Sequence, residues 1–334
     1  MYMLKRKAKA LITISLSTIL LVACSDKEVK VTTTTQEKSS QTKQKEQPPV
    51  PKEVFKQVKN LKQVGGESVV SKEVAGNNTS AVAARNGYVY YMYSYKKQTF
   101  ISIADVKKDK WVLKDKVIHQ TDATPYGTAF FAEDTMFFID EKGEIKKQVQ
   151  LPKVSRSLMS DDKTGYIRTS KGGAAYSTTK DMFKLFFEDG TEKEFPMTDY
   201  FSTSSMNDFI DLDKNIVYLN DGVDFTMYNL KKGKWVYDGN GKQVKHEKTI
   251  TDIIVPFQDY MIKVYGGNGQ DRLVYLDEKF KPKRSNGQQV PGQEFTVGDS
   301  RGQFLVEKDK LISVRVINFE GEKSVQYMEY KEVK

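Results

Sequence analysis

Cysteine is almost absent from this chain, since Cys24 is the single cysteine among 334 residues. No disulfide can form within the chain, so burial and hydrogen bonding alone must stabilise the folded part. Histidine is nearly as scarce, with only His119 and His246, and neither has a cysteine nearby or a second histidine at zinc-ligand spacing. We therefore expect no metal and no cofactor, and we place both histidines at the surface or in turns.

Hydrophobic runs long enough to cross a bilayer are also lacking. The uncharged run from Ala10 to Ala23 is shorter than the roughly twenty apolar residues that a spanning helix needs. It follows a cluster of positive charges at Lys5, Arg6, Lys7 and Lys9 and ends on a small residue. This layout is typical of a secretory signal peptide, which we predict over residues 1–23.

The four residues Leu21-Val22-Ala23-Cys24 resemble the lipobox of bacterial lipoproteins of the Gram-positive type. The resemblance implies cleavage between Ala23 and Cys24 and a diacylglyceryl group on the Cys24 sulfur. Buried lipid contributes about 0.8 kcal/mol per methylene, so two long chains would anchor the protein stably. We therefore expect a lipid-anchored protein on the extracytoplasmic face of the cell membrane. The alternative is an ordinary secreted protein with a leftover cysteine.

The net charge of +9 does not extend over the whole chain. The leader carries four positive charges and no acid, and residues 25–62 carry nine lysines and five acids, which leaves the rest of the chain near neutrality. A near-neutral body lacks the basic surface that binds phosphate backbones. We expect no nucleic-acid partner.

Residues 24–62 have the composition of a tether between the lipidated cysteine and the body. The polar segment Thr32–Gln47 has no apolar period, so we expect it to be disordered. Over residues 51–62, apolar side chains at helical spacing follow Pro51, which favours a short helix there. We assign residues 63–334 to one folded domain.

From residue 63 onward, short apolar runs alternate with turns that contain Gly, Asn and Asp, a pattern typical of an all-β fold. A unit of strands recurs about six times at a spacing of about 45 residues. We predict the first strands of the units at 88–93, 136–139, 165–167, 216–219, 260–265 and 311–316, and later strands at 100–103, 138–140, 184–187, 225–228, 273–276 and 325–328. Three units also share a lysine followed by an aromatic residue, at Lys110-Trp111, Lys234-Trp235 and Lys279-Phe280.

This pattern resembles a β-propeller of about six four-stranded blades, and the spacing allows five to seven. The alternative is an irregular pair of β-sandwiches. Because the last unit lacks chain for a fourth strand, we predict that Ser68–Val74 supplies the outer strand of the last blade. The aromatic run Tyr88–Tyr95 has large residues on both faces, which favours a strand buried between blades over an exposed carbohydrate platform.

Several apparent catalytic or metal-binding motifs lack the surroundings that their chemistry requires. Gly298–Gly302 matches G-x-S-x-G, but a strand follows Ser300 and both histidines precede it. Ser177–Lys180 matches S-x-x-K and Lys163–Gly165 matches K-T-G, but the two occur in reversed order. Asp211–Asn215 begins like a calcium loop and then lacks the required glycine and glutamate, which favours a strand entry with a solvated turn over the alternative of a weak calcium site.

Two functions remain from the sequence. The first is a non-catalytic surface lipoprotein, expected to be a monomer, that binds or scaffolds a protein or an envelope polymer. The second is an extracytoplasmic hydrolase or lyase that uses carboxylates at the propeller channel, for which the available acids are Glu133, Asp134, Asp161 and Asp162. The first is favoured because no acid and base pair stands out. A minor third option is that the leader fragment ending at Ala23 signals between cells.

Overall fold

The computed structural model describes residues 55–64, 80–153, 162–203, 208–220, 224–247, 253–257, 260–265, 271–285, 287–290, 293–295, 303–307, 310–319 and 322–332. The chain divides into two compact units, Met1–Gln47 and Pro48–Lys334, and all described residues belong to the second. Every regular element among them is a β-strand, which confirms the predicted all-β class. Over the same residues no helix is long and apolar enough to cross a membrane.

The strands of the first half of the body form antiparallel meanders, in which each strand pairs with the next one along the chain. The first sheet contains β2 (Ser80–Arg85), β3 (Tyr88–Tyr95), β4 (Gln98–Asp105) and β5 (Lys110–His119). The second contains β6 (Thr124–Pro125), β7 (Ala129–Ala132), β8 (Thr135–Ile139) and β9 (Ile145–Gln150). The third contains β10 (Lys163–Thr169), β11 (Gly172–Thr178), β12 (Met182–Phe187) and β13 (Glu192–Pro196).

The second half continues in the same way. The fourth sheet contains β14 (Phe209–Asp211), β15 (Ile216–Asn220), β16 (Asp224–Asn229), β17 (Lys234–Trp235) and β18 (Lys245–Glu247), and a short parallel pairing of β14 with β10 joins it to the third. The fifth contains β19 (Ile253–Phe257), β20 (Tyr260–Tyr265), β21 (Asp271–Leu276) and β24 (Gln293–Phe295), next to a small ribbon of β22 (Arg284–Ser285) and β23 (Gln288–Gln289). The last contains β25 (Gln303–Glu307), β26 (Lys310–Phe319), β27 (Glu322–Glu332) and β1 (Phe55–Val64).

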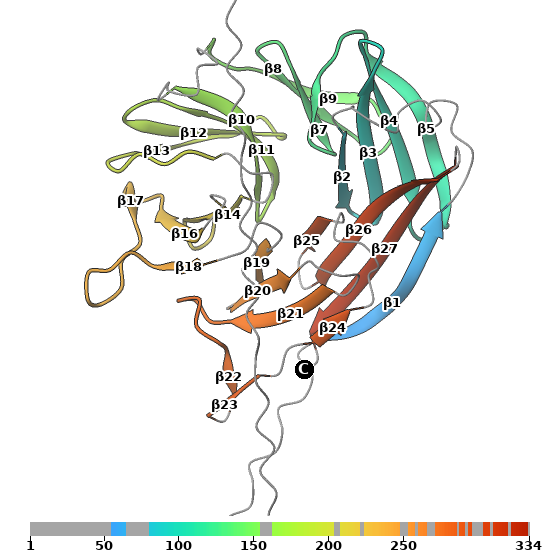
Figure 1. Ribbon diagram of the computed structural model, residues 1–334. Helices are drawn as coiled ribbons and strands as arrows, with labels where there is room; N and C mark the ends of the chain where they lie inside the picture. The colour runs from blue at the N-terminus through green and yellow to red at the C-terminus, as the bar shows by residue number, and fades with distance from the viewer. Residues whose placement is uncertain are drawn as a thin grey trace, which may run out of the picture. The chain divides into compact units, whose positions relative to one another are not determined.

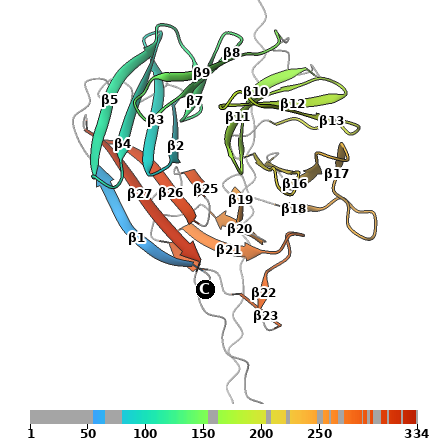
Figure 2. The same cartoon turned by 180° about the vertical axis from the view of Figure 1, so that it is seen from behind.

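Neighbouring sheets pack face to face and share hydrophobic cores. One core joins the first and last sheets, and others join the first to the second, the second to the third, the third to the fourth and the fourth to the fifth. Within the unit Pro48–Lys334, the sheets follow one another in chain order around a shared centre (Figures 1 and 2). The body is therefore propeller-like, as the sequence predicted.

Strand β3 shows why the sheets stack in this way. Val89, Tyr91 and Tyr93 on one face pack against the last sheet, whereas Tyr90 and Met92 on the other face pack against the second sheet. All five side chains are buried. The prediction that Tyr88–Tyr95 is core rather than an exposed platform is confirmed.

A recurring turn follows the third strand of the first and fourth sheets. The side chains of Asp105 and Asn229 each accept hydrogen bonds from backbone N–H groups two or three residues ahead. A residue with positive φ, Asp109 or Gly233, then leads into the lysine and tryptophan that begin β5 and β17. Lys110-Trp111 and Lys234-Trp235 therefore occupy the same place in their sheets, as predicted. The third differs, because Phe280 itself lies in the turn at φ 59°.

The predicted strands are found, but their places within the sheets were partly wrong. Residues 88–93, 216–219, 260–265 and 311–316 lie in the second strand of their sheets, whereas 136–139 lie in the third and 165–167 in the first. Residues 138–140 form no separate strand, since β8 ends at Ile139. Strands of an antiparallel meander have the same local pattern, so the sequence does not show which one begins a sheet.

The predicted helix over residues 51–62 is wrong, because Phe55–Val64 forms strand β1. β1 pairs antiparallel with β27, from Phe55 opposite Glu332 to Val64 opposite Val325. A short helix in water is marginal by itself, whereas the unpaired edge of β27 offers backbone hydrogen bonds along the whole segment. β1 therefore takes the edge position that we predicted for Ser68–Val74, and those residues lie outside the described part of the chain.

Deletion of residues 55–64 should destabilise the body, because it exposes the edge of β27. At roughly 0.5–1 kcal/mol for each lost hydrogen bond, the free energy of unfolding should fall by about 3 kcal/mol or more. Urea unfolding at equilibrium measures this change. Deletion of residues 32–47 is the control and should have little effect. Equal stability of the two deletion variants would show that β1 is not an integral strand.

Candidate functional site

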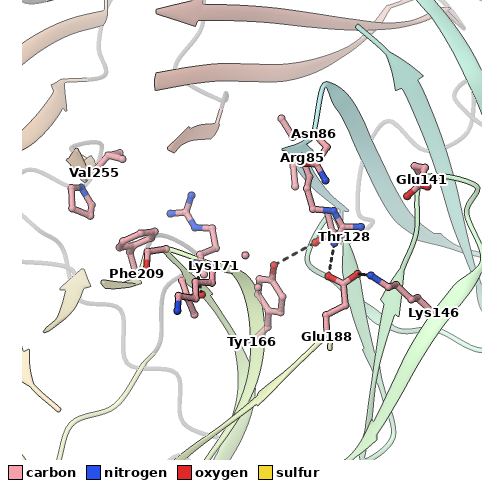
Figure 3. Close-up of a pocket in the computed structure, with 18 of the residues that line it drawn as sticks. Arg85, Asn86, Thr128, Glu141, Lys146, Tyr166, Lys171, Glu188, Phe209 and Val255 are labelled. Atoms are coloured by element: carbon pink, nitrogen blue, oxygen red, sulfur yellow. Dashed lines mark hydrogen bonds and ion pairs between the residues drawn. The ribbon is translucent and has the colours of Figure 1, made fainter. Parts of the chain in front are cut away.

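A cavity of about 450 Å³ lies where the first strands of several sheets come together. It is lined by residues of β2, β10, β14 and β19, by Thr128 before β7, and by turn residues that include Glu141, Lys171 and Glu188. Figure 3 shows these side chains arranged around the hollow, with Glu141, Lys146 and Glu188 on one side and Phe209 and Val255 on the other. The volume is within the range of about 300–1,000 Å³ that is usual for ligand sites.

Glu188 binds two of the cationic side chains on the charged side of the cavity. Its carboxylate accepts a hydrogen bond of 2.6 Å from Arg85 at the end of β2 and one of 3.1 Å from Lys146 in β9 (Figure 3). Glu188 itself lies in the turn after β12, so three different sheets meet at this one carboxylate. The Arg85 and Glu188 side chains are only 22% and 19% exposed, and water therefore screens this ion pair less than a surface pair.

Arg85 makes two further contacts besides its ion pair with Glu188. Its second guanidinium nitrogen donates to the carbonyl oxygen of Ile139 at 2.8 Å, and the guanidinium carbon lies 5.3 Å from the centre of the Tyr90 ring. Burial acts to lower the pKa of Arg85, but Tyr90 and Glu188 outweigh it and raise the pKa above its ordinary value. The guanidinium therefore stays charged and fixed.

Arg168 and Lys171 supply further positive charge to the cavity. Burial lowers the pKa of Arg168, and the nearby Tyr166 and Asp208 act in the opposite direction. Lys171 is exposed in the turn between β10 and β11, and it forms no ion pair with any residue that the structure describes. With Arg85 and Lys146, these residues give the cavity four cationic side chains against two carboxylates, Glu141 and Glu188.

The opposite wall is apolar. It is formed by Phe209 of β14 and by Ile254, Val255 and Pro256 of β19. The last three are buried in the body. The cavity thus presents a charged side and an apolar side to the same space, an arrangement that suits a ligand with both characters.

Tyr166 forms part of the cavity wall because a glycine leaves room for it. The Tyr166 hydroxyl lies 3.5 Å from the Thr128 hydroxyl, and its ring stacks on Tyr126 at 5.0 Å. A Cβ atom on Gly173, which pairs across the sheet with Arg168, would overlap the Tyr166 hydroxyl. Burial raises the pKa of Tyr166, so the hydroxyl is a hydrogen-bonding group and not an anion at neutral pH.

Gly173→Ala should force the Tyr166 ring out of its place. Overpacking of this kind costs about 1–3 kcal/mol, which urea unfolding at equilibrium would detect. Gly239→Ala is a matched control, because a Cβ atom there meets nothing within 4 Å. We expect it to change stability by less than about 0.5 kcal/mol. If the two variants were equally stable, Tyr166 would not be confined by Gly173.

The carboxylates that the sequence analysis offered for catalysis do not line the cavity. Glu133 and Asp134 form the turn between β7 and β8, and Glu133 lines a different hollow, next to His119. Asp162 is exposed just before β10, and Asp161 lies outside the described residues. Ala23, Cys24 and Ser300 also lie outside the described residues.

The remaining motifs are structural where the structure describes them. Lys163 of the K-T-G sequence donates to the Ser202 hydroxyl at 2.7 Å, while Ser177 of the S-x-x-K sequence is buried in β11. Asp211 closes a turn by accepting hydrogen bonds from two backbone N–H groups, and the described residues contain no group of three or more potential metal ligands.

The histidines are more enclosed than we expected. His119 ends β5 and lies against Phe130 and Phe137, and His246 is in β18, with Nε2 3.3 Å from the Lys263 ammonium. Both are partly buried and within strands, so the turn placement was wrong. Successive side chains in a strand point to opposite faces of the sheet, so a residue of any type can lie against a neighbouring strand or sheet.

The sequence analysis missed Arg85, Arg168 and Glu188. A local signal existed for two of them, because Arg85 precedes the hairpin dipeptide Asn86-Gly87 and Glu188 begins the turn sequence Glu188-Asp189-Gly190. Positive φ at Asn86 and Gly87 confirms the hairpin. Arg85 and Glu188 are 103 positions apart in sequence, and they meet only because of how the sheets pack.

Comparison with known proteins finds no matching family model and no matching curated protein. Among solved structures, the chain is similar to the WD40 domain of coronin from Toxoplasma gondii, with 10% identity, a TM-score of 0.40 and coverage of 84% of this chain and 86% of that one. The WD40 domain of SCAP from fission yeast is 9% identical, with a TM-score of 0.33 and coverage of 74% of this chain and 86% of that one. A protein of unknown function from Bacteroides caccae is 15% identical, with a TM-score of 0.33 and coverage of 67% of this chain and 84% of that one. At these identities and TM-scores the similarities identify no family and no function.

Proposed function

We propose that this protein is a lipid-anchored binding module on the extracytoplasmic face of the cell membrane, and that its ligand occupies the cavity described above. The observation that carries the proposal is the cavity itself, which combines fixed ion pairs, further cationic side chains and an apolar wall. Polar groups that fix a ligand's orientation beside an apolar surface are the usual composition of a binding site.

The body in this proposal is a propeller of six blades, closed where the two ends of the folded region pair. In support, β1 lies beside β27 in the last sheet. The first strands of the sheets also contact one another in sequence, with β14 against β19, β19 against β25 and β25 against β2. A closed arrangement leaves only short, protected sheet edges.

Binding is favoured over hydrolysis or lyase chemistry by the contacts of the cavity carboxylates. Both carboxylate oxygens of Glu188 already accept hydrogen bonds, one from Arg85 and the other from Lys146. A general acid or base must instead be placed to exchange a proton with the substrate. Glu141, the other carboxylate of the cavity, is exposed in a turn.

The anchor rests on the lipobox resemblance of Leu21-Val22-Ala23-Cys24. Cys24→Ala removes the sulfur that would carry the diacylglyceryl group. We expect the variant to move almost completely from the membrane fraction to the soluble fraction, because the two acyl chains of the diacylglyceryl group, at about 0.8 kcal/mol per methylene, supply the affinity. Fractionation and immunoblotting measure the change. A variant that stays in the membrane fraction would contradict the anchor.

A photo-crosslinking amino acid at position 171 tests where the ligand binds. Lys171 is exposed and lines the cavity, so the probe should join the body to its partner on intact cells. The same probe at Lys231, exposed in the turn between β16 and β17, is the control and should give no specific product. Mass spectrometry would identify what is joined. Equal products from both positions, or none from position 171, would contradict binding at the cavity.

A further inference from the structure

The cavity is continued by a second, smaller hollow of about 280 Å³. The two share Lys146, Lys171, Gly173 and Glu188, so they adjoin along one side. The second hollow adds Lys193 of β13 to the cationic side chains. A site that extends over two connected hollows favours an extended ligand over a compact small molecule.

Two of the three carboxylates that line this joint site, Glu188 and Asp189, are engaged within the protein, and the third is Glu141. Glu188 accepts hydrogen bonds from Arg85 and Lys146. Asp189 accepts hydrogen bonds from the backbone N–H and the hydroxyl of Thr191, at 2.8 and 2.6 Å. Glu188 is therefore paired with two cations, whereas Asp189 is held by neutral donors within its own turn.

Two cations of the joint site differ from these carboxylates in their contacts. Lys171 and Lys193 are both exposed, and neither forms an ion pair with a residue of the described ranges. Arg168 lies near the end of β10, three residues before Lys171. Arg168 and Lys171 line the cavity together with Phe209, Ile254 and Val255, and Lys193 adds a cation in the adjoining hollow.

We propose that the ligand is an acidic peptide segment of a partner protein, with carboxylates placed on Lys171 and Lys193 and apolar side chains placed on Phe209, Ile254 and Val255. This inference rests on the proposed binding function and specifies its ligand. An acidic peptide with interspersed apolar residues meets both sides of the site. A phosphate polymer would leave the apolar wall unused, and a free small acid would fill only part of the two hollows.

Fluorescence anisotropy with the detergent-solubilised full chain tests this assignment. The probes are short labelled peptides in which glutamate alternates with leucine, with matched peptides that carry glutamine for glutamate or serine for leucine. We expect the glutamate-leucine peptides to bind most tightly and their affinity to fall with salt. Lys171→Glu should weaken binding about tenfold or more, whereas Lys231→Glu should leave it unchanged.

Several results would overturn the inference. Equal binding of the glutamine peptides would remove the role of charge, and equal binding of the serine peptides would remove the role of the apolar wall. Competition by hexanoate as strong as that by the peptide would indicate a small-acid site, and preferential binding of poly(glycerol phosphate) would indicate an envelope polymer. Failure of all peptides while crosslinking at position 171 persists on cells would reject the acidic peptide and leave the binding function standing.

Discussion

The structure depends on sheets that are apolar on both faces. β3 buries Tyr93 against the last sheet and Tyr90 against the second, and each is only 1% exposed. Full burial of a large apolar side chain contributes about 1.5–3 kcal/mol, so a sheet of this kind is stable only between two others. In a chain with a single cysteine, this packing must supply the stability that disulfides provide elsewhere.

Face-to-face stacking also determines where a binding site can form. The first strands of four sheets, β2, β10, β14 and β19, line the cavity together. Glu188 then connects three sheets through Arg85 and Lys146. Because this carboxylate is largely withdrawn from water, its loss would leave the Arg85 charge poorly compensated. The network therefore holds the cavity in one shape.

Short motifs in this chain acquire meaning only from their surroundings. Lys163 and Ser177 belong to sequences that resemble parts of a catalytic site, yet one binds Ser202 and the other is buried in a strand. The turn after Asp105 and the turn after Asn229 carry no catalytic residue, but they repeat in sequence and in hydrogen bonding. In a fold built from repeated units, a recurring turn is good evidence for the repeat, whereas an isolated match to a catalytic motif is weak evidence for catalysis.

The sequence by itself determined the all-β class, the spacing of the units and the burial of Tyr88–Tyr95, because alternation and turn chemistry are local properties of the chain. Only the tertiary structure decided that residues 55–64 form β1, since the edge of β27 supplied hydrogen bonds that a local helical pattern cannot reveal. The same holds for Arg85 and Glu188, which are distant in sequence and meet only when the sheets pack. Long-range contacts of this kind leave no periodic trace in one sequence, and the candidate site consists almost entirely of them.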